Sequence, residues 1–114
     1  MAQEFTPGPW AVAKKASRRV TANGIIICNA VLRNRGGPKH KTYMKDEHEA
    51  EANAALLAAS PDMFAALVEA EARLRYSGDH FHDAGLISRA KADWASADMC
   101  RAAIAKALGH DHPR

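Results

Sequence analysis

The sequence predicts an α+β fold, in which a small antiparallel sheet of three to four strands precedes two long C-terminal helices. Three patterns indicate this fold: a β-branched run at 25–31, an Ala-rich stretch at 49–74, and a helical pattern that closes the chain. A chain of 114 residues has the length of one domain. We therefore expect a single domain over residues 1–114, with a basic β-meander at 1–45 and a helical hairpin at 46–114.

The N-terminal part of the chain carries the strand signals. Two prolines at Thr6–Trp10 exclude a helix there, and Trp10 is expected to anchor the core. Asn23-Gly24 is the strongest short hairpin signal, because both residues tolerate the positive φ of a type I′ turn. The β-branched run that follows is expected to be the central strand. The predicted strands are Trp10–Ala13, Arg19–Ala22 and Ile25–Val31, with Lys41–Met44 as the candidate fourth strand.

The helical part begins near Lys45, where acidic residues crowd the first turns and complement the helix dipole. Ser60-Pro61 combines a good N-cap with a good first helical residue, so the first long helix is expected to kink or break there. Tyr76–Gly85 is predicted to be a loop. The last helix is predicted over Leu86–Leu108, with Gly109 as its stop.

The net charge of +3 hides an asymmetry between the two halves. Up to residue 45 there are nine Lys and Arg against one acid, whereas residues 46–114 hold seven basic and twelve acidic side chains. A basic half favours an anionic partner, such as a nucleotide, a nucleic acid or an acidic protein face. The alternative is that the two halves neutralise each other, within the fold or across an oligomer.

Several classes of protein find no support in the sequence. No apolar run approaches the ~20 residues that a membrane span needs, and the first ten residues lack the pattern of a secretion signal. Cys28 and Cys100 form no CxxC pair, so two buried thiols in a reducing cytoplasm are favoured over a disulfide. No GxSxG, P-loop, GxGxxG or HExxH occurs, so neither an enzyme nor a cofactor is predicted.

One histidine-rich segment has the composition of a metal site. His80, His82 and Asp83 lie close together in sequence, and His110-Asp111-His112 adds further donors near the C-terminus. Both groups fall in segments expected to be flexible, and no third element supplies a fixed ligand. Solvated loop histidines are the favoured interpretation, and no metal is predicted.

The candidate ligand-binding residues gather in the basic half and at its border with the helices. Basic side chains around Gly36-Gly37 can hold a phosphate, and Asn53 can bond a ligand from an Ala-rich helix. Trp10 or Tyr43 can stack on a base. The alternatives are a solvated basic loop and an exposed or packing asparagine. The candidates are Arg18, Arg19, Arg33, Arg35, Lys39, Tyr43 and Asn53.

Three segments resemble a family of small phage and prophage accessory proteins. They are Thr6–Val12 (TPGPWAV), Glu49–Leu67, which matches the pattern EAxANAxLIAAAPDLLxAL, and the closing CRAAIAKALG. The chain departs from the family pattern at Leu57, at Ser60 and at Met63-Phe64, where Ile, Ala and Leu-Leu are more usual. The resemblance implies a phage origin and an accessory rather than a structural gene, and hence the cytoplasm of an infected bacterium.

The predicted layout is also similar to the Thoeris anti-defence sponge proteins of phages, which sequester cyclic nucleotide signals of host immunity without cleaving them. This similarity implies a phosphate-bearing ligand at the basic loop and the sheet–helix seam. The resulting hypothesis is a non-enzymatic, homo-oligomeric anti-defence protein that binds an anionic cyclic nucleotide. The alternatives are a protein-binding inhibitor of a host defence effector, similar to anti-CRISPR proteins, a small nucleic-acid-binding protein, and a metal-dependent hydrolase.

Overall fold

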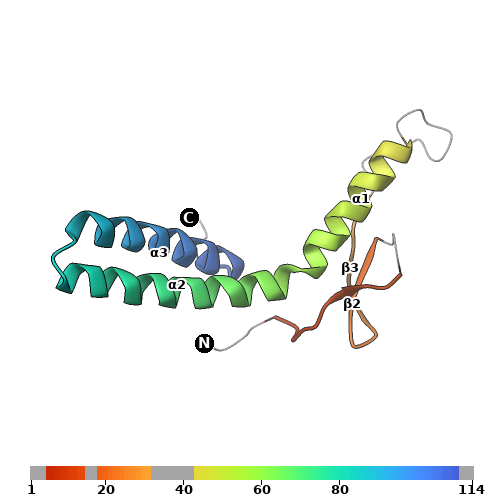
Figure 1. Cartoon of the computed structure of the whole chain (residues 1–114). Coiled ribbons are helices and arrows are strands. Elements are labelled where there is room, and N and C mark those ends of the chain that lie inside the picture. Colours follow the sequence, from red (N-terminus) through yellow and green to blue (C-terminus); the bar gives the residue numbers. More distant parts are fainter. Residues whose placement is uncertain (1–4, 15–17, 32–42, 111–114) are drawn as a thin grey trace. The chain divides into compact units, whose positions relative to one another are not determined.

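The computed structural model describes residues 5–14, 18–31 and 43–110, and within them it confirms the α+β fold (Figure 1). The strands come first and the helices follow. The elements are β1 (Ala11–Val12), β2 (Arg19–Ala22), β3 (Ile25–Asn29), α1 (Tyr43–Ala58), α2 (Ser60–Asp83) and α3 (Ile87–Ala107). The chain forms two compact units, Met1–Asp62 and Met63–Arg114. We call them the sheet unit and the hairpin unit.

The described sheet is antiparallel, with the strand order β1-β2-β3. Val20 of β2 pairs with Cys28 and Thr21 pairs with Ile26, so Ile27 is an extra residue on β3. Such a β-bulge changes the alternation of side chains between the two faces of a strand. Ile27 and Cys28 consequently both pack against the buried core of the sheet unit.

The Asn23-Gly24 turn that joins β2 to β3 confirms the sequence prediction, because both residues have positive φ, 51° and 81°. At Gly24 a branched side chain would be strained by the positive φ, although an added Cβ would meet no heavy atom of a non-neighbouring residue within 4 Å. We therefore expect Gly24→Val to lower the free energy of unfolding by about 1–2 kcal/mol through backbone strain alone. Chemical denaturation measures this loss, and equal stability of the variant would contradict the type I′ turn.

The core of the sheet unit forms where α1 packs on β1 and β2. Val20, Ala30, Ala50 and Ala54 are buried in one cluster. The two alanines of α1 have small side chains, so the helix backbone can approach the sheet closely. Trp10 packs against this cluster, as predicted, and its Nε1 donates a hydrogen bond to the carbonyl oxygen of Thr6 at 3.0 Å.

The start of α1 and the break at Ser60 refine the sequence predictions. Because α1 begins at Tyr43, residues 43 and 44 are helical and the candidate fourth strand is wrong there. The first helix ends at Ala58 and a new one begins at Ser60, so the predicted break is confirmed. Ser60 is nevertheless the first helical residue, and its Oγ donates to the carbonyl oxygen of Leu56 at 3.3 Å.

In the hairpin unit, α2 and α3 run antiparallel, side by side (Figure 1). The predicted loop at Tyr76–Gly85 is wrong, because α2 continues to Asp83. The helix ends in the turn that contains Gly85, where the Leu86 N–H donates to the carbonyl oxygen of Phe81 at 2.8 Å. The prediction for α3 is confirmed to within one residue at each end.

The buried part of the contact between α2 and α3 consists mostly of small residues. Among the described residues of the hairpin unit, the buried ones are Gly78, Ala90, Ala97 and Ile104. The Trp94 ring packs against Gly78.

Two hydrogen bonds cross the hairpin beside the Trp94 ring. The Trp94 Nε1 donates to Asp79 Oδ1 at 3.1 Å. Ser77 Oγ donates to Asp93 Oδ2 at 2.6 Å. Specific polar partners therefore fix the register of the two helices.

Ion pairs join the same two helices. Arg75 donates to Asp98 Oδ1 at 2.8 Å and to Glu71 Oε2 at 3.1 Å, and Arg101 donates to Glu71 Oε2 at 2.9 Å. The hydrogen bond to Asp98 raises the pKa of Arg75 above its ordinary value, although desolvation opposes the shift. Asp98 and Arg101 are exposed, whereas Arg75 and Glu71 are half-buried. Ion pairs near the surface each contribute little to stability, so their main effect is on register.

Two further predictions concern the thiols and the membrane. Cys28 and Cys100 are both free thiols, as expected, but each is half-buried and not buried as predicted. None of the helices in the described part of the chain is long and apolar enough to span a bilayer.

Candidate functional site

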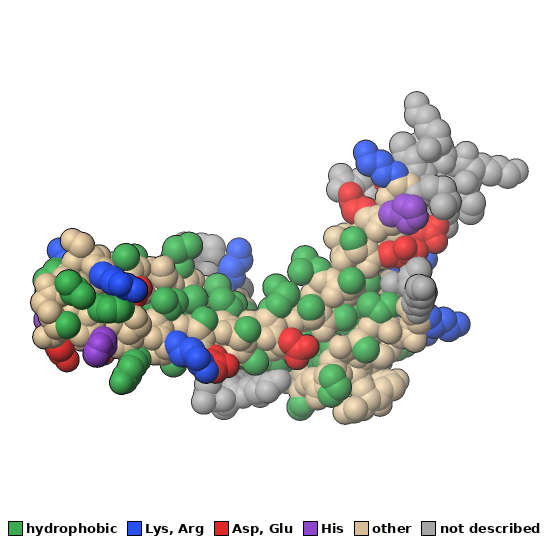
Figure 2. Space-filling model, viewed as in Figure 1, with side chains coloured by type: hydrophobic (Ala, Val, Ile, Leu, Met, Phe, Trp, Pro, Cys, Tyr) green, Lys and Arg blue, Asp and Glu red, His purple; other side chains and the backbone are tan. Residues whose placement is uncertain are grey.

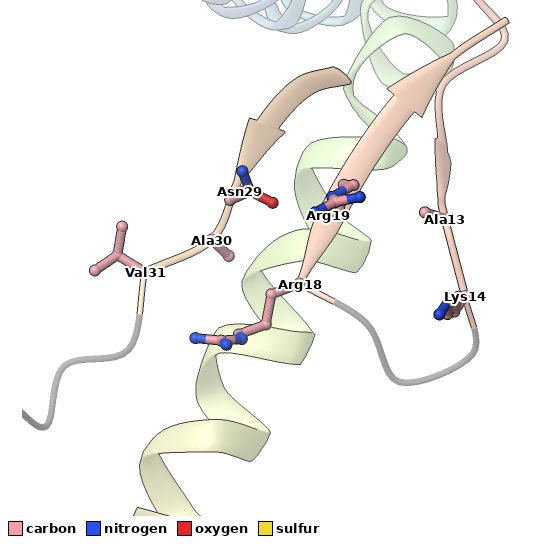
Figure 3. A pocket seen from close by; sticks show the side chains of 7 residues that line it. All are labelled: Ala13, Lys14, Arg18, Arg19, Asn29, Ala30 and Val31. Carbon is pink, nitrogen blue, oxygen red and sulfur yellow. The ribbon is translucent and has the colours of Figure 1, made fainter. Parts of the chain in front are cut away.

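The sheet unit has a hollow of about 620 Å³ at the end of the sheet where β1 and β3 end and β2 begins (Figure 3). It lies beside backbone segments of all three strands. The described residues that line it are Ala13, Lys14, Arg18, Arg19, Asn29, Ala30 and Val31.

Backbone hydrogen bonds position the two arginines of this hollow. The Ala13 N–H donates to the carbonyl oxygen of Arg19 at 2.9 Å, which extends the pairing of β1 with β2. The Ala30 N–H donates to the carbonyl oxygen of Arg18 at 2.8 Å, which holds the end of β3 against the start of β2. Figure 3 shows Arg19 between Asn29 on one side and Ala13 on the other. Arg18 and Arg19 are thus held between the two neighbouring segments.

The chemistry of the lining is basic and otherwise uncharged. Lys14, Arg18 and Arg19 supply three cationic side chains, and Asn29 supplies an amide, while none of the described residues that line the hollow is acidic. Arg19 already takes part in an interaction within the protein. Guanidinium and ammonium groups form strong, charge-assisted hydrogen bonds with phosphate and carboxylate. The arrangement is therefore suited to bind an anion.

Of the seven predicted ligand-binding residues, the described part of the structure brings together Arg18 and Arg19. Asn53 is exposed on α1 and does not line the hollow. Tyr43 is the first residue of α1, and its side chain lies outside the described part of the structure. Arg33, Arg35 and Lys39 also lie outside the described residues. A role for these residues in ligand binding stays a prediction.

Sequence reasoning missed two polar residues of the hollow, Lys14 and Asn29. The Asn23-Gly24 turn sets the register of β2 against β3, so it predicts which residue of β3 pairs with Arg19. A regular hairpin would pair Arg19 with Cys28, but the bulge at Ile27 shifts the pairing by one residue, so that Arg19 pairs with Asn29. The bulge has no clear sequence signature, so Asn29 could not be assigned to the site from the turn alone.

The histidine-rich segment lies in the last turns of α2 and not in a loop. The His80 ring lies edge-on to Phe81 at 5.6 Å between centroids, and the His82 ring lies 5.4 Å from Trp94. His82 Nδ1 is 3.7 Å from Asp83 Oδ1. Within the described residues, no three His, Cys, Asp or Glu side chains form a group that could hold a metal ion.

The fold and the hollow together define a small α+β protein with a candidate site for anions. The chain belongs to the family of Salmonella phage P22 protein Y8K6, whose family model matches residues 1–111. This membership supports a phage accessory protein, the class that the TPGPW and Ala-rich segments indicate. No curated protein and no solved structure was found to match the chain.

Proposed function

We propose that this phage protein binds and sequesters an anionic, phosphate-bearing ligand, and that the ligand is a cyclic nucleotide signal of host immunity in the cytoplasm of the infected cell. The observation that supports this proposal is that Lys14, Arg18 and Arg19 line one hollow, whose described lining includes no acidic residue. Such a set of cations holds a phosphodiester by charge and by hydrogen bonds together.

The size and the remaining lining residues favour a nucleotide over inorganic phosphate. A volume of about 620 Å³ lies within the range of small-molecule sites. The Asn29 amide offers both a donor and an acceptor, which suits the edge of a base. Ala13, Ala30 and Val31 add apolar surface that can contact a base or a ribose.

The proposed role is retention without chemical change. The guanidinium groups of Arg18 and Arg19 act as hydrogen-bond donors to an anion. The Asn29 amide does not titrate. These groups stabilise a bound phosphate, and the protein acts by lowering the concentration of the unbound signal.

The first test is a thermal-shift screen of the full chain against linear and cyclic di- and trinucleotides and cyclic ADP-ribose isomers. A ligand at ~100 times its Kd adds about 2.7 kcal/mol of stability, which is a measurable shift for a chain of this size. We expect a cyclic nucleotide to raise Tm, and we expect the ligand released by heating to be chemically intact.

Replacing Arg18 by alanine should weaken binding of that ligand by about 10- to 100-fold, because a hydrogen bond to a charged group contributes about 1.5–3 kcal/mol. Titration calorimetry measures the change. The matched control is Arg73→Ala, since Arg73 is an exposed arginine of α2 that pairs with Glu69 and lies in the hairpin unit. Equal Kd values for Arg18→Ala and Arg73→Ala would show that the ligand does not bind in the hollow. A thermal-shift screen in which no nucleotide raises Tm would contradict the proposal that the ligand is a nucleotide.

A second candidate function is supported by the edge of the sheet. In the described sheet β3 is an edge strand, and its Ile25 and Ile26 are 64% and 52% exposed. Such an edge can accept a strand from another protein, as a protein-binding inhibitor of a host defence effector requires. This function predicts a host protein that co-purifies whether or not nucleotide is present and is lost on Ile26→Lys. If the Ile26→Lys variant still retained the host protein, the edge of β3 would be excluded as the binding surface.

A further inference from the structure

The hairpin unit has two chemically different sides. On one side α2 and α3 exchange the polar contacts of Arg75 with Asp98, Arg101 with Glu71, and Trp94 with Asp79. On the other side the contacts between the helices are Ser77 with Asp93, and Arg89 over the Phe81 ring. We call the first the charged side of the hairpin and the second its apolar side.

The apolar side follows from the spacing of residues along the two helices. A turn of 3.6 residues places residues three and four apart on one stripe. In α2 the stripe that contains Ser77 and Phe81 also holds Met63, Ala66, Leu67, Ala70 and Leu74. In α3 the corresponding stripe, beside Asp93 and Arg89, holds Ala92, Ser96, Met99, Cys100, Ala103 and Ala107.

The charges that border this side have partners within the hairpin. Asp93 accepts the hydrogen bond of Ser77 at 2.6 Å, and the Arg89 guanidinium lies 4.2 Å from the Phe81 ring centroid. Along the margin of α2, Arg73 pairs with Glu69 at 2.7 Å. In the view of Figure 2, hydrophobic side chains gather along both helices of the hairpin. Asp93 and Arg89 carry opposite charges, so the described part of the apolar side has no net charge that would repel an identical surface.

The hairpin buries too little by itself to account for two long ordered helices. Its buried residues, in the part of the chain that is described, are a glycine, two alanines and Ile104. The larger side chains Leu67, Leu74 and Phe81 are only half-buried, and Met99 is 74% exposed. Ordering the backbone costs about 1–2 kcal/mol per residue, which such a small interior does not offset. The hairpin therefore needs a cover that is present whenever the chain folds.

The area of the apolar side matches what a stable dimer buries. Helices of 24 and 21 residues are about 36 and 32 Å long at a rise of about 1.5 Å per residue. Two such helices, each about 10 Å wide, present a face of about 600–700 Å² in projection. Side-chain relief raises the accessible area toward the ~800 Å² per partner of a standard interface.

We propose that the apolar side packs against the same side of a second copy of this chain, giving a homodimer joined by a four-helix bundle. The contact is isologous, so each copy covers the other with the same residues. Leu67, Leu74 and Phe81 become buried on assembly, and the charged sides face solvent as in other bundles. This dimer uses the hairpin unit, so it stands or falls separately from the anion site of the sheet unit.

Light scattering coupled to size exclusion tests the proposal on the full chain. The expected mass of the wild type is twice the 12.3 kDa of the chain. Met99→Glu combined with Ala103→Glu should halve the mass, because both exposed positions lie on the apolar side one helical turn apart. The matched control is Ala72→Glu combined with Tyr76→Glu, which adds the same charge at two exposed positions of α2 away from that side, and it should keep the dimer mass.

A wild-type mass of one chain at all concentrations would overturn the proposal, and so would equal masses of the two double variants. A second protein in the wild-type peak in place of a second copy would also overturn it. If the Met99→Glu, Ala103→Glu double variant loses its helical circular dichroism, its mass no longer tests assembly. The mass and the Tm of the wild type then decide between monomer and dimer. The Tm of a dimer rises with protein concentration, and a constant Tm would contradict the proposal.

Discussion

Replacing Gly78 by alanine should lower the stability of the protein by about 1–3 kcal/mol, the usual cost of overpacking a closely packed contact. Gly78 lies in the interior of α2, and the Trp94 indole packs against its backbone. A Cβ at this position would clash with the indole ring. Trp94 is not free to move, because its Nε1 is bonded to Asp79 and its ring faces His82.

The sign of the stability change of Gly78→Ala distinguishes packing against Trp94 from helix propensity. In a helix without such a contact, glycine to alanine stabilises by about 0.5–1 kcal/mol, so helix propensity alone predicts the opposite result. Urea unfolding followed by circular dichroism measures the sign. In the background of Trp94→Ala the same Gly78→Ala change should become neutral or stabilising, and a double-mutant cycle gives the coupling. A stabilising effect in the wild-type background would contradict the packing of Trp94 on Gly78.

Gly78 also explains why the helical hairpin was only partly predictable. The sequence YSGDHFHD contains a glycine, two aspartates and two histidines, all of which lower helix propensity. Local signals therefore favoured a loop, whereas the structure keeps these residues in α2 to Asp83. Contacts with α3, above all those of Trp94, override the local preference. Residues more than ten positions apart carry this information, and a local pattern cannot show it.

The charge asymmetry between the halves looks different once the units are known. Because α1 packs on the sheet, its acidic residues Asp46, Glu47, Glu49 and Glu51 belong to the sheet unit. That unit, residues 1–62, has nine basic and six acidic side chains, whereas residues 63–114 have seven of each. Much of the asymmetry between the halves therefore disappears when the acidic residues of α1 are counted with the sheet unit. The cations gathered at the hollow are therefore a better argument for anion binding than the net charge of residues 1–45.

The sequence predicted the strands, the type I′ turn and the last helix well, because each depends on residues adjacent in sequence. The candidate site depended on register. Arg18 and Arg19 were recognised by their charge beside a strand, and the structure places both in the hollow. Asn29 depends on the bulge at Ile27, and Lys14 depends on the pairing of β1 with β2. The charge and periodicity of a sequence do not predict such pairing between strands.

Replacing Ala54 by leucine should lower the free energy of unfolding by about 3 kcal/mol, at the upper end of the cost of overpacking. Ala54 of α1 is fully buried in one cluster with Val20 of the sheet. Three additional carbon atoms find no space there unless α1 moves away from β2. Leucine is nearly as good a helix former as alanine, so the loss measures packing and not helix propensity.

The neighbouring residue offers the control, because Ala55 is exposed on the same helix. Ala55→Leu should change the stability by less than about 0.5 kcal/mol, as surface substitutions usually do. Chemical denaturation of both variants compares them directly, and equal stabilities would show that α1 does not pack on the sheet.

The same pair of variants also tests whether the core of the sheet unit supports the anion site. Ala30 belongs to the cluster of Ala54 and lines the hollow, so Ala54→Leu should weaken anion binding while Ala55→Leu leaves it unchanged.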